Sequence, residues 1–168
     1  RSRGLGDVYK RQPVVVRKIK GNTGSIQIWI ERAKMELDRQ KEKIDPPDKT
    51  GWYLQIQNMR LFDNLIYNED RNQGNILIDE AWKVWLIDHT RAFRTHHDPP
   101  SPQLVRNCDE KIWENLRNLN EETLKEKLRD FLRGNEISAI LKRRDVLVER
   151  IQSQIDLRGE DTVLFQLF

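Results

Sequence analysis

The stretch 67–91, YNEDRNQGNILIDEAWKVWLIDHTR, constrains the fold more than any other part of the chain. A loop of polar and turn-forming residues leads into two short runs of β-favouring residues, 75–79 and 83–89, which are separated by the three residues EAW. This pattern predicts an antiparallel hairpin. The chain leaves along the first strand from Asn75 and returns along the second strand to Asp88, so we expect both residues at one end of the hairpin.

Three oxygen-bearing side chains in this stretch form a candidate catalytic site. Paired residues of an antiparallel hairpin lie about 5 Å apart, so Asn75 and Asp88 can share one ion, and their oxygens suit Mg²⁺ or Mn²⁺ better than zinc. Asp70 precedes these ligands and is predicted to orient a substrate hydroxyl and accept its proton during phosphoryl transfer. Arg71 beside it is a charge that keeps Asp70 ionised or contacts phosphate. An ordinary turn-rich loop is the alternative, because Asn, Asp and Gly favour turns for backbone reasons alone.

Ahead of this stretch, the sequence predicts a second hairpin and two helices. Strands at 13–20 and 25–31 are joined by GNTG, in which Gly21 and Gly24 supply the permissive backbone of a tight connection. A short exposed helix within 32–44 is ended by the DPP sequence at 45–47. The next helix is predicted from apolar residues that recur at helical spacing on one buried face: Trp52, Ile56, Met59, Phe62 and Ile66.

After the site, the chain is predicted to be irregular at 96–102 and helical beyond it. One helix spans 109–119, and a second is capped by Asn120 and ends just before Gly134. A final helix starts after Asn135 and stops near Gly159. The expected fold class is therefore α+β, a mostly helical domain with two small β-hairpins.

Composition limits the class of protein. A chain of 168 residues and 20.1 kDa has the size of one domain, and a mean hydropathy of −0.80 with 34% charged residues excludes a membrane-embedded protein, so no transmembrane segment is expected. The single cysteine, Cys108, cannot form an internal disulfide and is expected to be a buried thiol in a reducing compartment. A cytoplasmic location is favoured for this reason.

Residues 1–12, RSRGLGDVYKRQ, resemble translated adapter sequence and are set aside as an artefact that we expect to be disordered. Four basic residues and one acidic residue in this segment account for the whole formal charge of +3. The rest of the chain is neutral, so its pI of 9.0 gives no reason to expect a nucleic-acid partner. Setting the segment aside implies that the true N-terminus is missing and that the chain is a fragment.

The loop and hairpin resemble the catalytic and metal-binding loops of the protein-kinase-like superfamily. The five-residue interval from Asp70 to Asn75 matches the catalytic loop, and Asp88, in the sequence DHT, matches the metal-binding aspartate of a DFG-type motif. DRNQGN is closest to the loops of phosphatidylinositol kinases and of secretory-pathway (Golgi casein kinase-like) kinases, and LFDNLIYN before it has the same character. The resemblance implies a kinase-like C-lobe that uses ATP and Mg²⁺ or Mn²⁺ to transfer the γ-phosphoryl group to a hydroxyl-bearing substrate.

The same resemblance assigns roles along the chain. Residues 13–31 correspond to the end of the N-lobe and the hinge, which places Ile28, Trp29, Ile30 and Glu31 near adenine, and 32–168 correspond to the C-lobe. The chain departs from the family pattern because the histidine before the catalytic loop is absent and DHT replaces DFG. A glycine-rich phosphate loop and its partner lysine are also missing, so the N-lobe is largely absent and the fragment is expected to be inactive alone.

Other polar clusters are weaker candidates. His96, His97 and Asp98 are better explained as a solvated loop than as metal ligands, although the corresponding region of the superfamily helps to dock substrate. The basic run 142–144 is interpreted as a solvated helix face, and Arg91 and Arg94 as contacts either to phosphate or to surface acids. A degenerate kinase-like binding or scaffold module without catalysis is the alternative function, but it has no evident need for Asp70, Asn75 and Asp88 together.

Overall fold

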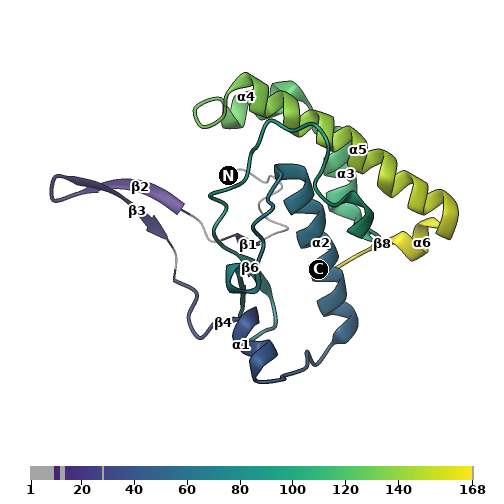
Figure 1. The fold of residues 1–168 in the computed structure, drawn as a ribbon, viewed down its shortest axis with the longest axis horizontal. Helices are drawn as coiled ribbons and strands as arrows, with labels where there is room; N and C mark the ends of the chain where they lie inside the picture. Colours follow the sequence, from purple (N-terminus) through teal and green to yellow (C-terminus); the bar gives the residue numbers. More distant parts are fainter. Residues whose placement is uncertain (1–9, 12–13, 28, 168) are drawn as a thin grey trace. The chain divides into compact units, whose positions relative to one another are not determined.

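The computed structural model describes residues 10–11, 14–27 and 29–167, and it confirms a mixed α+β fold that is mostly helical (Figure 1). The chain forms two compact units. Unit 1 contains the described residues up to Pro47 together with Asn72–Asp88, and unit 2 contains Asp48–Arg71 and the described residues from His89 onward. The sequence predicted other boundaries, after residues 12 and 31, and that division stays a prediction.

Unit 1 is built on a small four-stranded sheet. The strand order is β1-β6-β5-β4, in which β5 pairs antiparallel with both β4 and β6, and β1 runs parallel to β6. The strands are β1 (Lys10–Arg11), β4 (Lys34–Met35), β5 (Ile76–Ile78) and β6 (Val84–Leu86). The β5–β6 pair is the hairpin predicted from NILID and KVWLIDH. Of the segment 1–12, which we expected to be disordered, the structure describes only Lys10–Arg11, and these residues form β1.

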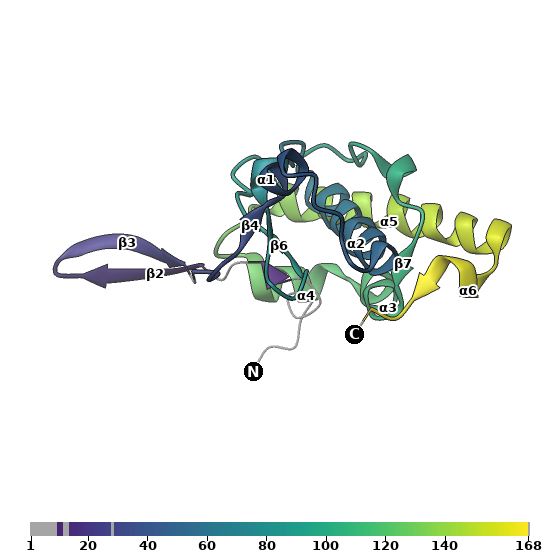
Figure 2. The same ribbon diagram turned by 90° about the horizontal axis from the view of Figure 1, so that it is seen from below.

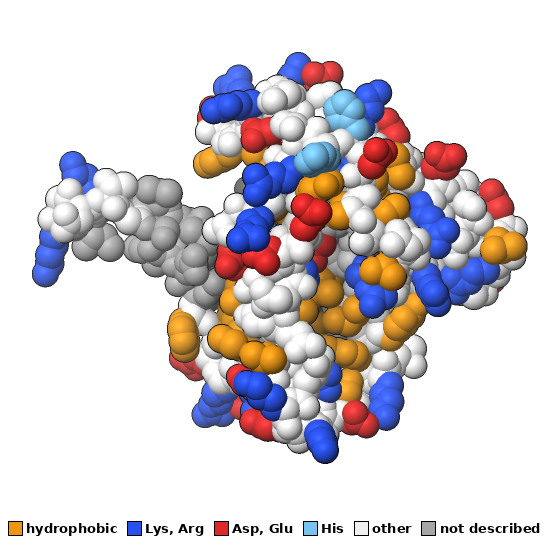
Figure 3. All heavy atoms as spheres, in the orientation of Figure 1, with side chains coloured by type: hydrophobic (Ala, Val, Ile, Leu, Met, Phe, Trp, Pro, Cys, Tyr) orange, Lys and Arg blue, Asp and Glu red, His pale blue; other side chains and the backbone are white. Residues whose placement is uncertain are grey.

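A second hairpin in unit 1 joins β2 (Val14–Ile19) to β3 (Asn22–Gln27), as predicted (Figure 2). Its turn is shorter than expected, because Lys20 and Gly21 adopt φ values of 48° and 86° and Gly24 lies inside β3. Two consecutive positive φ values are typical of the type I′ turn that matches the twist of a two-stranded ribbon. Lys18 and Lys20 are exposed near this turn, and blue side chains mark the end of the ribbon in Figure 3.

The expected short helix is α1 (Glu36–Lys41), but it is not exposed throughout. Glu36 is buried. Both oxygens of its carboxylate accept hydrogen bonds from Arg39, at 2.6 and 2.7 Å, and Oε1 also accepts one from Gln40 at 2.7 Å. A buried charge is tolerated when it is paired and hydrogen-bonded in this way. The prediction of a solvated helix was therefore wrong at its first residue.

Unit 2 is organised around α2 (Lys49–Ile66), the amphipathic helix predicted from the apolar spacing. Its N-cap is Asp48, whose side chain accepts a hydrogen bond from the Gly51 N–H at 2.9 Å. Met59 and Ile66 are buried as expected, whereas the other three residues of the predicted face are half-buried. The buried surface of α2 also carries polar side chains, which the apolar pattern did not reveal: Gln57, Asn58, Asp63 and Asn64.

The remaining helices of unit 2 follow the predicted order, and α2 and α3 both contact α5. Asn120 caps α4 as expected, and Gly159, with a φ of 87°, ends α5. Asp109, predicted as the first residue of a helix, is the N-cap of α3. Gly134 was misassigned, because α4 ends six residues before it and Gly134 begins α5. The helices are α3 (Glu110–Asn118), α4 (Glu121–Leu128), α5 (Gly134–Arg158) and α6 (Glu160–Val163), and η3 (Pro102–Leu104) is a short 3-10 turn.

A short parallel pair, β7 (Cys108–Asp109) with β8 (Leu164–Phe165), was not predicted. Polar side chains fix it: Asn58 accepts a hydrogen bond from the Asp109 N–H at 3.1 Å, and Asp109 accepts one from the Leu167 N–H at 3.2 Å. Cys108 is buried, as expected, and burial raises the pKa of its thiol. In the part of the chain that the structure describes, no helix combines the length and apolarity needed to cross a bilayer.

Candidate functional site

The structure brings Asn75 and Asp88 to the same end of the β5–β6 hairpin in unit 1. Ile76 pairs with Leu86, and beyond this pair the Ile87 N–H donates to the Asn75 carbonyl oxygen at 3.2 Å. Asp88 follows Ile87 directly. The geometric part of the prediction is therefore confirmed, since the hairpin returns the chain to the level of Asn75.

Local sequence explains why both residues stand at this end. Asn75 closes the 3-10 turn η2 (Gln73–Asn75), which is capped by the Asn72 side chain accepting from the Gly74 N–H at 2.8 Å. Asn75 is half-buried, whereas Asp88 is exposed and adopts a left-handed φ of 53°. A left-handed conformation is uncommon for a residue other than glycine, and Asp is among the residues that tolerate it best. β6 ends at Leu86, and Asp88 follows two residues later as an exposed residue.

The donor chemistry of this end fits a hard cation. An amide oxygen and a carboxylate oxygen are ligands that Mg²⁺ accepts, and Mg²⁺ usually keeps waters and substrate phosphates as its other ligands. Among the described residues, no group of three or more His, Cys, Asp or Glu is arranged to hold a metal ion. A site that used only Asn75 and Asp88 would therefore depend on the phosphates of a nucleotide to complete its coordination.

The opposite end of the same hairpin is closed by Asp79. Its Oδ1 accepts hydrogen bonds from the N–H groups of Ala81 and Lys83, both at 2.9 Å, and its Oδ2 accepts one from the Trp85 indole at 2.9 Å. A groove of about 370 Å³ lies beside this turn in unit 1. Three cations line it, but each is already paired with a glutamate: Arg32 with Glu80, Lys34 with Glu42, and Arg39 with Glu36.

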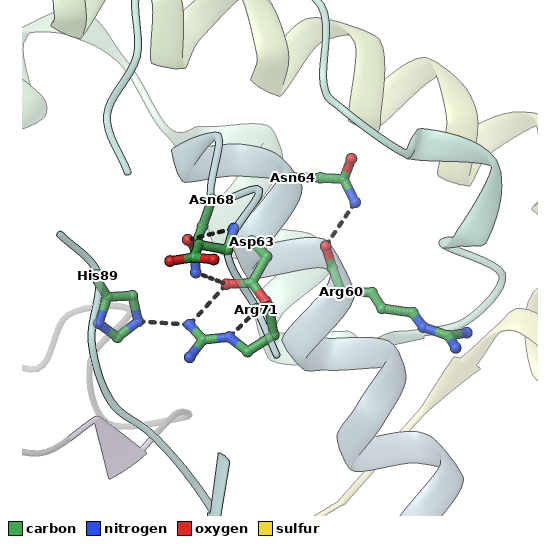
Figure 4. A network of polar contacts seen from close by, with 7 residues as sticks. Arg60, Asp63, Asn64, Asn68, Arg71 and His89 are labelled. Carbon is green, nitrogen blue, oxygen red and sulfur yellow. Dashed lines mark hydrogen bonds and ion pairs between the residues drawn. The ribbon is translucent and has the colours of Figure 1, made fainter. Parts of the chain in front are cut away.

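In unit 2, a carboxylate on α2 organises the loop that contains Asp70 (Figure 4). Asp63 accepts from Arg71 at both oxygens, with Nε–Oδ2 and Nη2–Oδ1 distances of 3.0 and 2.9 Å, and from the Asn68 side chain at 2.9 Å. The Asn68 N–H also donates to the Asp63 carbonyl oxygen at 2.8 Å. Asp63 is only 6% exposed. The two residues that flank the Glu69–Asp70 dipeptide are thus tied to one buried side chain of a helix.

His89 extends this network. Its Nε2 lies 3.0 Å from Arg71 Nη2, and its ring meets the Phe62 ring edge-on at a centroid distance of 5.8 Å. Because a guanidinium can only donate, the ring nitrogen that faces Arg71 is the acceptor. Figure 4 shows His89 reaching this guanidinium from the segment that follows β6 in the sequence.

The role predicted for Arg71 needs correction. Two of its nitrogens bind Asp63, and its side chain is only 7% exposed. It therefore holds the loop to α2 and is not available to reach a phosphate. A cation that the structure places beside Asp70 is Arg91, whose Nε lies 3.6 Å from Asp70 Oδ2. Both side chains of this pair are accessible, at 68% for Arg91 and 40% for Asp70.

Of the segment expected near adenine, the described residues 29–31 are not part of a strand. Ile28 lies outside the described residues, and β3 ends at Gln27, so the predicted strand through 25–31 was too long. Trp29 is 83% exposed, Ile30 is half-buried and Glu31 is exposed. Their assignment to a nucleotide site stays a prediction.

The basic run 142–144 was misjudged at its central residue. Arg143 is fully buried, with no exposed surface, whereas Lys142 is exposed. His96, His97 and Asp98 are exposed, as expected for a solvated loop, but the His96 ring stacks on Tyr67 at a centroid distance of 4.8 Å. The chain also holds two organising residues that the sequence interpretation did not assign, Asp63 and Arg143. A charged residue between the buried Leu61 and Leu65 was the signal for Asp63, because a buried charge needs a partner.

No protein-family model matches the chain, and no curated protein matches it.

Proposed function

We propose that this chain carries the metal-binding and base residues of an ATP-dependent phosphotransferase that moves the γ-phosphoryl group to a hydroxyl. The observation that carries the proposal is the position of Asn75 and Asp88 at one end of the β5–β6 hairpin. An amide and a carboxylate at neighbouring positions form a minimal ligand pair for Mg²⁺ or Mn²⁺. The bound cation would neutralise charge on the phosphates of ATP.

In this reaction, Asp70 acts as the base. The substrate oxygen forms a bond to the γ-phosphorus, the bond from that phosphorus to the β–γ bridging oxygen breaks, and ADP leaves. The hydroxyl proton passes to the Asp70 carboxylate, which is partly exposed and lies on a loop held by Asp63. A fixed loop supports this role, because a base must be held within hydrogen-bond reach of the proton it removes.

Arg91 takes the place that the sequence interpretation gave to Arg71. Its guanidinium lies beside the Asp70 carboxylate, and its exposure leaves it able to contact a phosphate as well. An exposed ion pair of this kind is worth only about 0–1 kcal/mol, so an incoming substrate can displace it at little cost. Arg71 acts at a distance by fixing the loop.

Binding of Mn²⁺ with ATP, followed by electron paramagnetic resonance, tests the metal site. We expect Asp88→Ala and Asn75→Ala to weaken Mn²⁺–ATP binding by more than about tenfold, since even changes to residues behind the ligands cost that much. Glu80→Ala is the matched control, because Glu80 is a carboxylate at the opposite end of the same hairpin. Equal losses in Glu80→Ala and Asp88→Ala would contradict a metal site at Asp88.

The Asp70→Asn variant distinguishes the role of the base from the role of the metal ligands. It should leave Mn²⁺–ATP binding intact. In a chain joined to an N-lobe, which we expect activity to require, it should lower phosphoryl transfer by about 10²–10⁴, the usual contribution of a positioned base. The alternative function, a kinase-like binding module without catalysis, predicts that nucleotide binding is indifferent to Asp88→Ala. That result, or a wild-type chain that does not bind Mn²⁺–ATP, would overturn the proposal.

A further inference from the structure

The middle of α5 carries a completely buried arginine whose partners are all neutral. Arg143 Nε donates to the Leu65 carbonyl oxygen at 2.8 Å, and Nη1 donates to the carbonyl oxygens of Arg94, at 2.9 Å, and His96. Its guanidinium also lies over the Tyr67 ring, 5.6 Å from the centroid. In the part of the chain that the structure describes, Arg143 forms no ion pair with a carboxylate.

Burying a charge among neutral partners costs free energy of folding. Burial lowers the pKa of Arg143 to about 10, so the side chain remains charged at neutral pH without a counter-ion. Its Nη2 is buried and has no hydrogen-bond partner among the residues that the structure describes. Part of this cost is offset because Leu65 lies in the last turn of α2, where the carbonyl oxygens at the negative end of the helix dipole attract a cation. An apolar side chain of similar volume would avoid the cost altogether.

The contacts of Arg143 fix one particular segment, His89–His96. Arg143 links the last turn of α2 to the carbonyls of Arg94 and His96, and the Phe93 N–H donates to the Ile66 carbonyl oxygen at 2.6 Å. Phe93 adopts a left-handed φ of 62°, a conformation that a bulky residue holds only when its surroundings impose it. The backbone of this segment is therefore anchored while the Arg91 side chain, three residues before Arg94, remains exposed.

We infer that Arg143 is a positioning residue that holds Arg91 against Asp70 by clamping the segment His89–His96 onto the end of α2. The functional part of this inference rests on the proposed phosphoryl transfer, in which Asp70 is the base. Arg143 touches neither Asp70 nor a reacting atom. It acts through the backbone of Arg94 and His96, and its planar fork is suited to this task because it donates in several directions at once.

Arg143→Lys tests the clamp. Lysine keeps the charge at the end of α2 but cannot bridge the Leu65 carbonyl to those of Arg94 and His96 with a planar fork. We expect amide exchange of Phe93 to accelerate by about tenfold or more, as for the loss of one charge-assisted hydrogen bond. The guanidinium Nε–H signal of Arg91 in the ¹⁵N NMR spectrum should move toward that of an unpaired arginine. Lys142→Met is the matched control, since Lys142 is the exposed neighbour on the same helix.

The Arg91 signal distinguishes positioning from a general loss of stability. If Arg143 only stabilised the packing of α5, Arg143→Lys would lower the melting temperature but leave the Arg91 signal unchanged below it, and the inference would be overturned. Should Arg143→Lys fail to fold, Tyr67→Leu removes the ring that contacts both Arg143 and His96 while leaving α5 intact. The same change in the Arg91 signal is expected, and an unchanged signal contradicts the clamp.

If the proposed function is wrong, the experiments give a result that differs from the one expected if the clamp is wrong. A wild-type chain without Mn²⁺–ATP binding would remove the catalytic role, yet the Arg91 and Phe93 measurements would still report whether the clamp exists. If Mn²⁺–ATP binds and the clamp exists, Arg143→Lys should keep Mn²⁺–ATP binding, since Asn75 and Asp88 are not among its contacts. In a chain joined to an N-lobe, the same variant should lower kcat for phosphoryl transfer. An unchanged kcat alongside a shifted Arg91 signal would contradict the positioning role.

Discussion

Three of the residues that organise unit 2 carry charges that are buried. Asp63, Arg71 and Arg143 are all removed from water, yet none belongs to the apolar spacing from which helices are predicted. Sequence reasoning identified Asp70, Asn75 and Asp88 because their spacing resembles a catalytic loop. It missed Arg143 because a run of three basic residues on a helix is usually solvated, and only the packing of distant segments reveals that its central member is enclosed.

Asp63→Asn tests the pair that holds the Asp70 loop. The substitution keeps the shape of the side chain but removes the negative charge that pairs with the buried Arg71. Removing one partner of a buried ion pair typically costs about 3–5 kcal/mol, and we expect a loss of this order in urea denaturation. Glu121→Gln, which breaks the exposed Glu121–Lys125 pair of the same unit, should cost less than about 1 kcal/mol. Similar losses for the two variants would contradict the importance of burial.

Glu36 predicts a pH dependence in unit 1. Burial by itself raises the pKa of Glu36, but hydrogen bonds from Arg39 and Gln40 outweigh it, so the pKa lies below its ordinary value of 4.5. The stability contributed by Glu36 is therefore fully present above pH 4.5 and is lost as the pH falls through the lowered pKa. Glu36→Gln should lower the melting temperature at neutral pH, and its difference from wild type should shrink in acid. Glu42→Gln, at an exposed pair, is the control. A difference independent of pH would contradict this assignment.

Elements with a strong local signal were predicted well, and those that depend on distant contacts were not. The period of apolar residues located α2, and the capping residue Asn120 located α4. The end of α4 was misplaced because Gly134 has the character of a helix terminator, whereas here it starts α5. The β7–β8 pair could not be predicted, because it joins segments more than fifty residues apart. The polar contacts that fix it, from Asp109 to Asn58 of α2 and from Leu167 to Asp109, also join distant parts of the chain.

The β2–β3 turn offers a test at the level of one element. Lys20 holds a positive φ that is unfavourable for lysine, and asparagine followed by glycine is the preferred pair for a type I′ turn. Lys20→Asn should stabilise the hairpin by up to about 1 kcal/mol, whereas Gly21→Ala should destabilise it, because alanine is strained at a φ of 86°. Amide exchange across β2 and β3 measures both effects. A stabilised Gly21→Ala variant would exclude this turn geometry.

At the scale of the whole molecule, the described residues of the two units differ in how many apolar side chains they bury. In the described part of unit 1, the buried apolar side chains are Ile76, Ile78 and Leu86. Unit 2 holds the larger core, which includes Leu61, Leu116, Leu147 and Ile151 on three helices. Because burial of apolar surface dominates folding stability, we expect unit 1 to be the less stable part.

Native-state amide exchange in increasing urea tests this difference. The amides of β5 and β6 should exchange through an opening with a smaller free energy and a smaller urea dependence than the amides of α2 and α5, because less surface becomes exposed. The amides of Leu116 and Leu147 serve as reporters of unit 2. A single free energy and slope for both sets would mean that the molecule unfolds as one cooperative body.

The interleaving of the two units has a consequence for synthesis of the protein. Strand β4 finds its neighbour only when β5 has been translated, and β6 must follow before the sheet is complete. During that interval the ribosome releases the whole of α2, a helix whose own packing partner, α5, is still to come. Both units therefore remain incomplete at the same time, until β6 and α5 have been synthesised.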